Sequence, residues 1–218
     1  MTSSDPTRRA VLSALALAPI LASPILASPF LASPALAAAM SAEDQALQSK
    51  VVAYLEALTS AKGRFMQTDP RGDKSEGSIY LQRPGKARFE YDPPSGLLIT
   101  SDGKIVTVSN SRLRTNTQRY SFGATPLSLF LGRQIRLDRG VAVTSVVRQP
   151  GGFTIVVRDA RGQAEGSVAL EFADNPMRLR GWTLTDAQRH ATTVKITELE
   201  PVGALPDSLF QQPTSPTR

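Results

Sequence analysis

The most regular pattern in the chain is an alternation of apolar and polar residues across positions 77–103. Ile79 and Leu81 share one parity, and after a Pro-Gly turn at positions 84–85 the run Phe89-Glu90-Tyr91 repeats the alternation. A period of two residues is typical of antiparallel strands that bury one face. The stretch therefore predicts three strand runs joined by turns.

Arg83 departs from this alternation, because it falls on the same parity as Ile79 and Leu81. A charge on an apolar face is costly unless it finds hydrogen-bond acceptors. The alternative is that Arg83 ends the strand and reaches past the turn into water with its long side chain. Spacing alone favours the alternative.

The chain ahead of these strands carries a helical pattern. Ser41 followed by Asp44 resembles a capping box in which Asp takes the place of Glu. Gly63 is close enough to the end of the pattern to serve as its stop signal. The apolar residues that share one face at helical spacing are Leu47, Val51, Tyr54, Leu55 and Leu58. By itself, this stripe indicates core packing rather than function.

Strand patterns fill most of the remaining chain and are separated by turn residues. Outside the central stretch, the predicted strands span positions 64–68, 104–108, 112–120, 141–148, 153–158, 167–172, 179–185 and 192–199. Together with the central runs they make about ten or eleven strands, spaced as in an antiparallel meander or an open barrel. No helix alternates with the strands, which argues against a parallel sheet.

A short apolar segment interrupts the strand series. Thr125-Pro126 predicts an N-cap followed by proline at the first helical position, and Gly132 ends the run. Between them, positions 127–131 are apolar on nearly every side. Such a segment plugs the end of a barrel or forms a lid over an apolar cavity. The residues alone do not choose between these two roles.

Composition removes several classes of function. The 218 residues include no cysteine and a single histidine, His190, which lies in a predicted hairpin turn. We therefore expect no disulfide, thiolate chemistry, zinc site or Ser-His-Asp triad. No G-x-S-x-G motif is present, and the acidic residues are scattered, so we predict no catalytic residue, metal or cofactor.

The net charge and the apolar content restrict the possible partners less than the residue types do. The net charge of +6 is spread along the chain, which argues against nucleic acid and is compatible with an acidic partner or an anionic membrane surface. Apolar residues make up 41% of the chain but aromatic residues only 6%, so aliphatic side chains must fill much of the core.

The first 39 residues have the pattern of an export signal. Arg8-Arg9 precede an apolar stretch at positions 10–36, which contains three LASP repeats and is interrupted by prolines. Ala35-Leu36-Ala37 fits a signal-peptidase site, and Ala37-Ala38-Ala39 is a rival. We predict a cleaved signal peptide at 1–39 and a single domain at 40–218. The run at positions 7–12 resembles a twin-arginine signal, and a Sec-type signal is the alternative.

Motifs spread along positions 40–218 resemble those of the LolA family of periplasmic lipoprotein carriers. The matching segments are Phe65-Met66-Gln67, 77–84 with its Arg83-Pro84 end, Phe89-Glu90-Tyr91, Pro93-Pro94, 99–103, Thr125-Pro126-Leu127 and 205–210. Each is weak alone, but their order and spacing together are specific. After Gly132 and before this C-terminal motif, only the strand pattern matches.

The resemblance implies a mainly β (α+β) fold, an unclosed antiparallel β-barrel with an N-terminal helix and a short helical lid over an apolar cavity. It also implies that Arg83 is the latch that ties its strand to the lid. The residues expected to line a cavity for acyl chains are Phe65, Ile79, Leu81, Phe89, Tyr91, Leu127, Leu129 and Phe130.

The resemblance further implies a monomeric, non-enzymatic carrier in the periplasm. Its implied partners are lipoproteins, an inner-membrane ABC transporter that releases them, and an outer-membrane acceptor. Three other functions stay open. The first is a lipid-binding or envelope-stress-sensing module on the same fold. The others are an envelope hydrolase, against which the missing catalytic motifs count, and an interaction protein that docks through positions 127–131.

Overall fold

The computed structural model describes residues 40–112, 117–125, 127–135, 137, 141–160 and 166–212. These residues belong to one compact unit that begins at Met40. The predicted signal peptide and Pro126 lie outside the described residues. In the ranges given above, no helix is both long and apolar enough to cross a membrane.

A single antiparallel sheet forms the framework. Its strands are β1 (Ser60–Thr68), β2 (Lys74–Gln82), β3 (Lys86–Tyr91), β4 (Leu97–Asp102), β5 (Ile105–Asn110), β6 (Gln118–Ser121), β7 (Val141–Gln149), β8 (Gly152–Asp159), β9 (Ser167–Ala173), β10 (Arg178–Thr185) and β11 (Ala191–Pro201).

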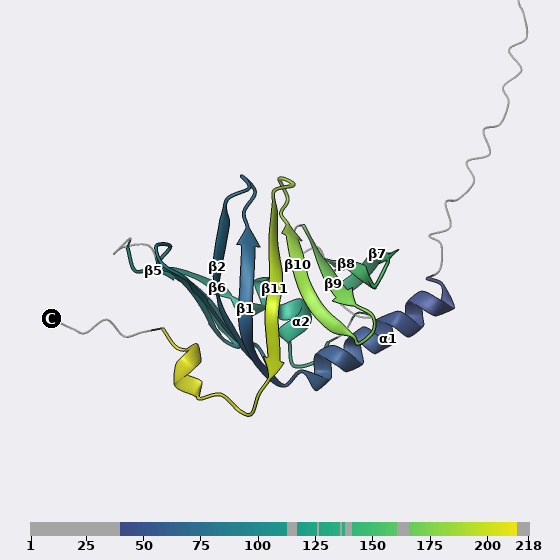
Figure 1. Ribbon diagram of the computed structural model, residues 1–218, viewed down its shortest axis with the longest axis horizontal. Helices are drawn as coiled ribbons and strands as arrows, with labels where there is room; N and C mark the ends of the chain where they lie inside the picture. Colours follow the sequence, from purple (N-terminus) through teal and green to yellow (C-terminus); the bar gives the residue numbers. More distant parts are fainter. Residues whose placement is uncertain are drawn as a thin grey trace, which may run out of the picture. The chain divides into compact units, whose positions relative to one another are not determined.

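The order of the strands explains why the barrel stays open. It runs β6-β5-β4-β3-β2-β1-β11-β10-β9-β8-β7, so the first and last strands pair in the middle, as Figure 1 shows. Each other neighbouring pair is consecutive along the chain, which is a meander. β6 and β7 are the two edges and do not pair with each other. The eleven strands confirm the predicted unclosed antiparallel architecture, which the local alternation of the sequence favours at each strand.

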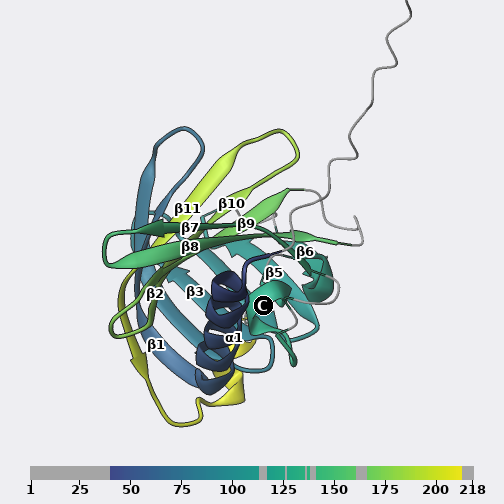
Figure 2. The same ribbon diagram turned by 90° about the vertical axis from the view of Figure 1, so that its right-hand side faces the viewer.

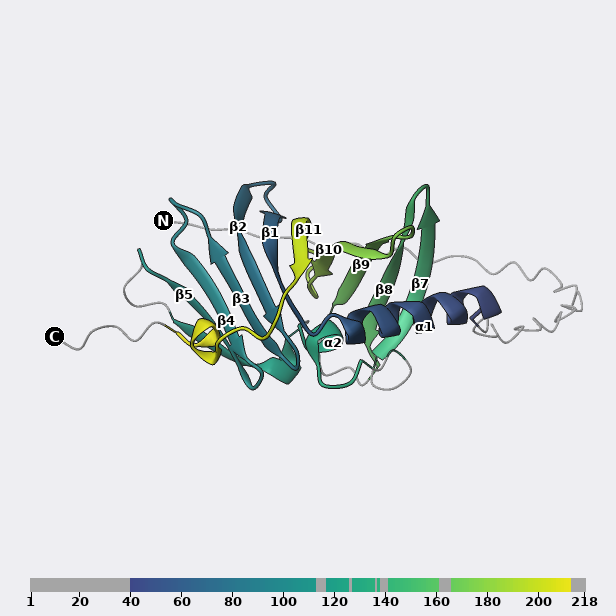
Figure 3. The ribbon, with the colours of Figure 1, turned by 60° about the horizontal axis from the view of Figure 1, so that its bottom comes forward.

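Helix α1 (Ala42–Ala57) lies against the concave face of the sheet. Figure 2 shows the strands curving around it, and Figure 3 shows it crossing below β7–β10. Its side chains Val51 and Leu55 are buried, in line with the predicted stripe. Tyr54 Oη accepts a hydrogen bond from the backbone N–H of Leu179 on β10 at 3.1 Å. The helix is therefore held by apolar packing and, at Tyr54, by a polar contact with the sheet.

The ends of α1 only partly follow the prediction. Ser41 is its N-cap, and Ser41 Oγ accepts from Asp44 N–H at 3.1 Å. The expected stop at Gly63 is wrong, because α1 ends at Ala57 and Gly63 lies within β1 opposite Leu199. A Cβ added at Gly63 would lie only 1.8 Å from the carbonyl oxygen of Glu198. This glycine therefore permits a close approach of β1 to β11 and does not end a helix.

The short helices follow β6. η1 (Phe122–Ala124) precedes α2 (Ser128–Leu131), which ends at Gly132 as expected. The predicted N-cap at Thr125 is wrong, because Leu127 holds that position and the Thr125 hydroxyl donates to the carbonyl of Phe122 at 2.7 Å. Thr125 therefore closes the turn of η1, and the N-cap of α2 makes no side-chain hydrogen bond.

Two strands begin or end away from their predicted limits. β1 starts at Ser60, four residues before the predicted start, because Ser60 already pairs with Gln82. The predicted strand at 112–120 is reduced to β6, since Arg112 lies in a turn and β6 starts at Gln118, while residues 113–116 lie outside the described ranges. The later predicted strands agree with β7–β11 to within one or two residues.

The C-terminal segment returns to the outer face of the sheet. Its 3-10 helix η2 (Asp207–Phe210) packs on β3 and β4, with Phe210 only 2% exposed. Lys86 Nζ and Asp207 Oδ1 form an ion pair at 2.6 Å, and Arg88 Nη1 donates to the Leu209 carbonyl at 3.2 Å. The segment is therefore fixed by one buried ring and by several polar contacts, which include a bond from Leu205 N–H to Gln82 Oε1 at 2.6 Å.

Candidate functional site

A row of aromatic side chains runs through the interior of the sheet. Phe130 of α2 contacts Trp182 with ring centroids 5.2 Å apart, and Trp182 contacts Phe89 at 6.0 Å. Phe89 contacts Phe65 at 5.6 Å, and Phe65 contacts Tyr91 at 5.1 Å. The last three contacts are edge-to-face, a favourable arrangement of aromatic rings. The row therefore joins the short helix to strands β1, β3 and β10.

The structure brings the residues expected in the cavity into one apolar cluster. Strand pairing explains this, because Ile79 lies opposite Phe89 and Leu81 opposite Ala87 on the concave side. Six of the eight are buried, whereas Leu127 and Leu129 are partly buried and pack against the others. The buried six are Phe65, Ile79, Leu81, Phe89, Tyr91 and Phe130. These side chains fill the interior between the sheet and the helices.

Three residues that the sequence did not assign to the cavity also belong to this interior. Trp182, the single tryptophan of the chain, lies in the middle of the aromatic row on β10. Val51 and Leu55 of α1 belong to the same cluster, although their stripe indicated only core packing. The parity of Trp182 within its predicted strand was a usable signal, since Trp182 shares it with apolar Leu184.

Arg83 joins the end of β2 to the last turn of α2. Its Nη1 donates to the carbonyl of Phe130 at 2.8 Å, and its Nη2 donates to that of Gly132 at 2.8 Å and, at 3.5 Å, to that of Arg133. The last carbonyls of a helix have no partner within the helix, so they are natural acceptors for a guanidinium. The side chain is therefore bound to backbone acceptors in α2 and in the two residues that follow it.

The electrostatic setting of Arg83 follows from its partial burial. Burial lowers the pKa of its guanidinium, and the Glu56 carboxylate of α1 acts in the opposite direction. An arginine stays protonated in proteins, so the five donors of Arg83 remain available. The backbone adds a further tie, because Gly85 N–H donates to the carbonyl of Leu131 at 2.7 Å. The β2–β3 turn thus holds α2 by side chain and backbone together.

Helix α1 has its own polar contact near its start. Arg148 of β7 forms an ion pair with Asp44 at 2.7 Å, and Glu43 lies 3.9 Å from the same guanidinium. Hydrogen bonding with Ser41, followed by that with Arg148, lowers the pKa of Asp44. No local pattern predicts this pair, because its members are about a hundred positions apart in the sequence.

One polar pair lies among the apolar residues of the interior. The Tyr91 hydroxyl on β3 donates to Gln67 Oε1 on β1 at 2.7 Å. Tyr91 is 6% exposed, and its burial raises the pKa of the phenol to about 12. The hydroxyl is therefore protonated at any physiological pH and acts as a neutral donor.

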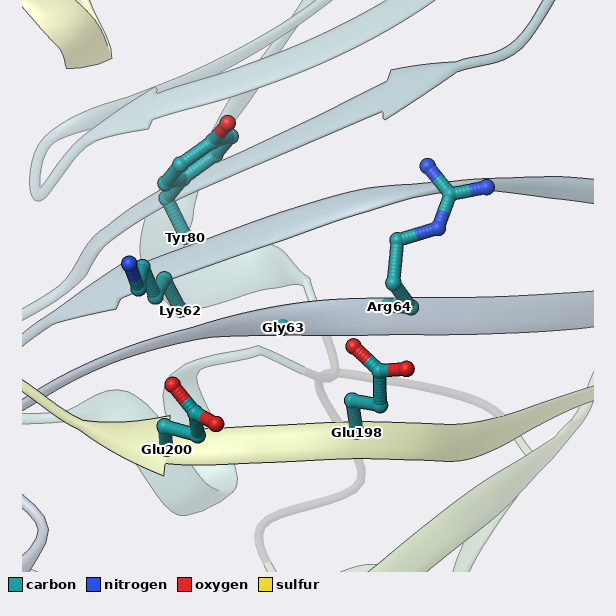
Figure 4. Close-up of a pocket in the computed structure, with 6 residues that line it drawn as sticks. All are labelled: Lys62, Gly63, Arg64, Tyr80, Glu198 and Glu200. Atoms are coloured by element: carbon teal, nitrogen blue, oxygen red, sulfur yellow. The ribbon is translucent and has the colours of Figure 1, made fainter.

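A shallow hollow on the outer face of the sheet has a different character. Figure 4 shows its lining residues, which are Lys62, Gly63, Arg64, Tyr80, Glu198 and Glu200. Arg64 is engaged by Asp92 in an ion pair, which raises the pKa of the guanidinium. The hollow carries charges of both signs and has no side chain of the interior in its lining. The hollow therefore offers charged groups to a ligand, whereas the apolar side chains gather in the interior.

The acidic side chains and the histidine do not gather in the part of the chain that the structure describes. No group of three His, Asp or Glu side chains in these ranges is placed to hold a metal ion. His190 is exposed in the β10–β11 turn, where its Nδ1 lies 3.0 Å from Asp186 Oδ2. This agrees with the prediction of a solvated turn residue.

Comparison with known proteins gives a consistent result. Residues 56–213 match the sequence model of the family described as outer membrane lipoprotein carrier protein LolA. An outer-membrane lipoprotein carrier protein of Methylobacillus flagellatus is 30% identical over 168 residues, covering 73% of this chain and 80% of that protein. A protein of the same description from Bordetella pertussis is 30% identical over 184 residues, or 80% and 85% of the two chains.

Solved structures that resemble this fold are more distant. A LolA superfamily protein from Nitrosomonas europaea has 9% sequence identity and a TM-score of 0.41, covering 75% of this chain and 97% of that one. A protein from Thermus thermophilus has 14% identity and a TM-score of 0.47, covering 77% and 94% of the two chains.

Proposed function

Because the chain belongs to the LolA family of outer-membrane lipoprotein carriers, we propose that it is a periplasmic carrier of lipoproteins. It binds the acyl chains of a lipoprotein in its interior and delivers them to the outer membrane. Its proposed partners are an inner-membrane ABC transporter that releases the cargo and an outer-membrane acceptor that receives it. The carrier works as a monomer and without catalysis.

The contact of Arg83 with the carbonyls of Phe130 and Gly132 carries this proposal. Burial of each methylene group contributes about 0.8 kcal/mol, so the acyl chains of one lipoprotein gain tens of kcal/mol in total. A carrier that bound so tightly would never release its cargo. A competing closed state, with the interior filled by its own side chains and held by a polar latch, offsets much of that gain.

Opening of the lid is therefore the step that admits cargo. When α2 moves away, Phe130 leaves Trp182 and the interior becomes available to acyl chains. When the cargo leaves, Arg83 recovers its carbonyl acceptors and the aromatic row closes. The residues proposed to meet the acyl chains are those of the predicted cavity, with Leu127 and Leu129 at its lid side.

Export of the chain is part of the same proposal. Residues 1–39 act as a cleaved signal, by the Sec or the twin-arginine route, and the carrier domain starts near residue 40. Sequencing the N-terminus of the exported protein tests this. A mature chain that still begins at Met1 would contradict it.

Site-specific crosslinking in the periplasm tests the carrier function. A photo-crosslinking amino acid at Leu129 or Phe130 should capture lipoproteins, whereas the same probe at the exposed Arg119 of β6 should not. Mass spectrometry of the protein purified from the periplasm gives a second readout. Capture from Arg119 alone, or co-purification of free lipid without lipoprotein, would overturn the proposal, and the second result would favour a lipid-binding or stress-sensing module.

A further inference from the structure

The hydrogen-bonded pair of Tyr91 and Gln67 is unusual for its surroundings. Gln67 follows Phe65 by two residues on β1, so both side chains belong to the concave side of the sheet. Tyr91 lies opposite Gly77 on the same side and contacts the ring of Phe65. A polar pair inside an apolar interior is costly unless its hydrogen bonds are made.

The hydrogen bond between Tyr91 and Gln67 uses only some of the hydrogen-bonding groups of the two side chains. Tyr91 Oη donates to Gln67 Oε1 at 2.7 Å, which uses the phenol proton and one acceptor of the amide. No residue in the described ranges accepts a hydrogen bond from Gln67 Nε2, and the Gln67 side chain is half-buried. A glutamine amide has two N–H donors. The N–H donors of the Gln67 amide are therefore available to a ligand at the margin of the interior.

The donors of Gln67 lie where they can bind a ligand, because the pair is at the end of the aromatic row opposite the lid. Tyr91 is at one end of the aromatic row, and Phe130 of α2 is at the other. An acyl chain that replaced the row along its length would extend from the lid toward Tyr91. If the hydrocarbon end of the chain takes the place of Phe130 under the lid, the carbonyl group at its head lies at the other end of the row, near the amide of Gln67.

We propose that Gln67 and Tyr91 form a polar subsite for the carbonyl oxygens of the ester or amide linkages that join acyl chains to the cargo. This rests on the proposed carrier function. Gln67 Nε2 donates to the linkage carbonyl, and Tyr91 is a positioning residue that fixes the amide through Gln67 Oε1. The subsite lets the carrier distinguish acylated cargo from plain hydrocarbon chains, which offer no acceptor.

Two matched lipopeptides test the subsite with the full mature protein. One carries two ester-linked palmitoyl chains on a glyceryl-cysteine peptide, and the other carries hexadecyl chains in ether linkage and so lacks both carbonyls. Trp182 is the only tryptophan and lies within the row, so its fluorescence reports occupancy. We expect the parent protein to bind the ester about fivefold more tightly than the ether, as one neutral hydrogen bond would give.

Substitutions then show which residues cause the preference for the ester over the ether. Gln67→Glu keeps the acceptor for the Tyr91 hydroxyl but loses the N–H donors, and it should reduce the ester-to-ether ratio to about one. Gln67→Leu should do the same while leaving the affinity for the ether within about twofold. Tyr91→Phe should reduce the ratio in part. Tyr80→Phe changes a tyrosine on the outer face and should leave the ratio as in the parent.

The outcomes separate the subsite from the carrier function. If the parent binds both lipopeptides equally, or if Gln67→Glu and Gln67→Leu keep the parent ratio, the subsite is refuted and the carrier function stands. If neither lipopeptide binds to the parent, the carrier function fails and the subsite fails with it. Thermal melting of each variant shows that the comparison is between folded proteins.

Discussion

Replacing Arg83 by leucine removes the three hydrogen bonds that join β2 to the end of α2. Two of them are 2.8 Å long, whereas the bond to the Arg133 carbonyl is 3.5 Å and adds little. A hydrogen bond to a charged group contributes about 1.5–3 kcal/mol net. Partial burial of the guanidinium offsets some of this gain, so we expect the closed, empty state to lose about 2–4 kcal/mol.

This loss acts on the balance between the closed and open states. Since 1.4 kcal/mol corresponds to a factor of ten, the balance shifts toward the open state by roughly 30- to 700-fold. In a domain of this size the thermal midpoint of the empty protein should fall by about 5–15 °C. The leucine also adds apolar surface to the interior, so loading of cargo should survive or become tighter.

The decisive measurement is release of a bound lipoprotein to acceptor membranes. Release from Arg83→Leu should be slower than from the parent, because closure no longer competes with the acyl chains. Arg83→Lys should be intermediate, since an ammonium group keeps the charge but loses the planar arrangement of donors. Arg180→Leu is the matched control, because Arg180 also donates to a backbone carbonyl, that of Gly151 at 3.3 Å, outside the lid. Release from Arg83→Leu at the parent rate would refute the latch.

Three further predictions concern the elements around the interior. Tyr54→Phe removes the acceptor of Leu179 N–H and should lower the free energy of unfolding by about 0.5–1.5 kcal/mol in urea titrations, and no change would show that water replaces the bond. Phe210→Ala should lower it by about 3–5 kcal/mol, and a loss below about 1 kcal/mol would show that the C-terminal segment is not anchored by its ring. The pKa of Asp44 is lowered by hydrogen bonding with Ser41 and, after it, with Arg148, so these contacts stabilise the fold above the unfolded pKa and their contribution is lost as pH falls through the folded pKa. Urea unfolding of the parent and of Arg148→Met should therefore differ more at pH 7 than at pH 3, and an equal difference would exclude this pair as the cause.

The sequence by itself determined most of the sheet. Strand positions follow from the alternation of apolar and polar residues, which each segment carries locally, so β2, β3 and β8–β11 lie where the pattern put them. The apolar face was determined in the same way, because Ile79, Leu81 and Phe89 share a parity whichever strands become neighbours. The start of α1 at Ser41 was equally local, since a cap acts over three residues.

Only the tertiary structure decided what these elements contact. Gly63 was misread as the end of a helix because its role depends on the close approach of β11, which is far away in the sequence. Thr125 was misread as the N-cap of α2 because it closes η1 instead, and α2 begins only after Leu127. Alternation also gave no hint that β1 and β11 meet, since the pairing of the first and last strands is settled by packing around one interior.

Arg83 shows the same division at the candidate site. Spacing placed its charge on the apolar face but favoured an exposed strand end, and a family resemblance was needed to suggest the lid. Its acceptors are backbone carbonyls of Phe130 and Gly132, nearly fifty positions away, and every residue type has such a carbonyl. The sequence could therefore specify the donor, whereas the acceptors exist as a set only after α2 has packed against the sheet.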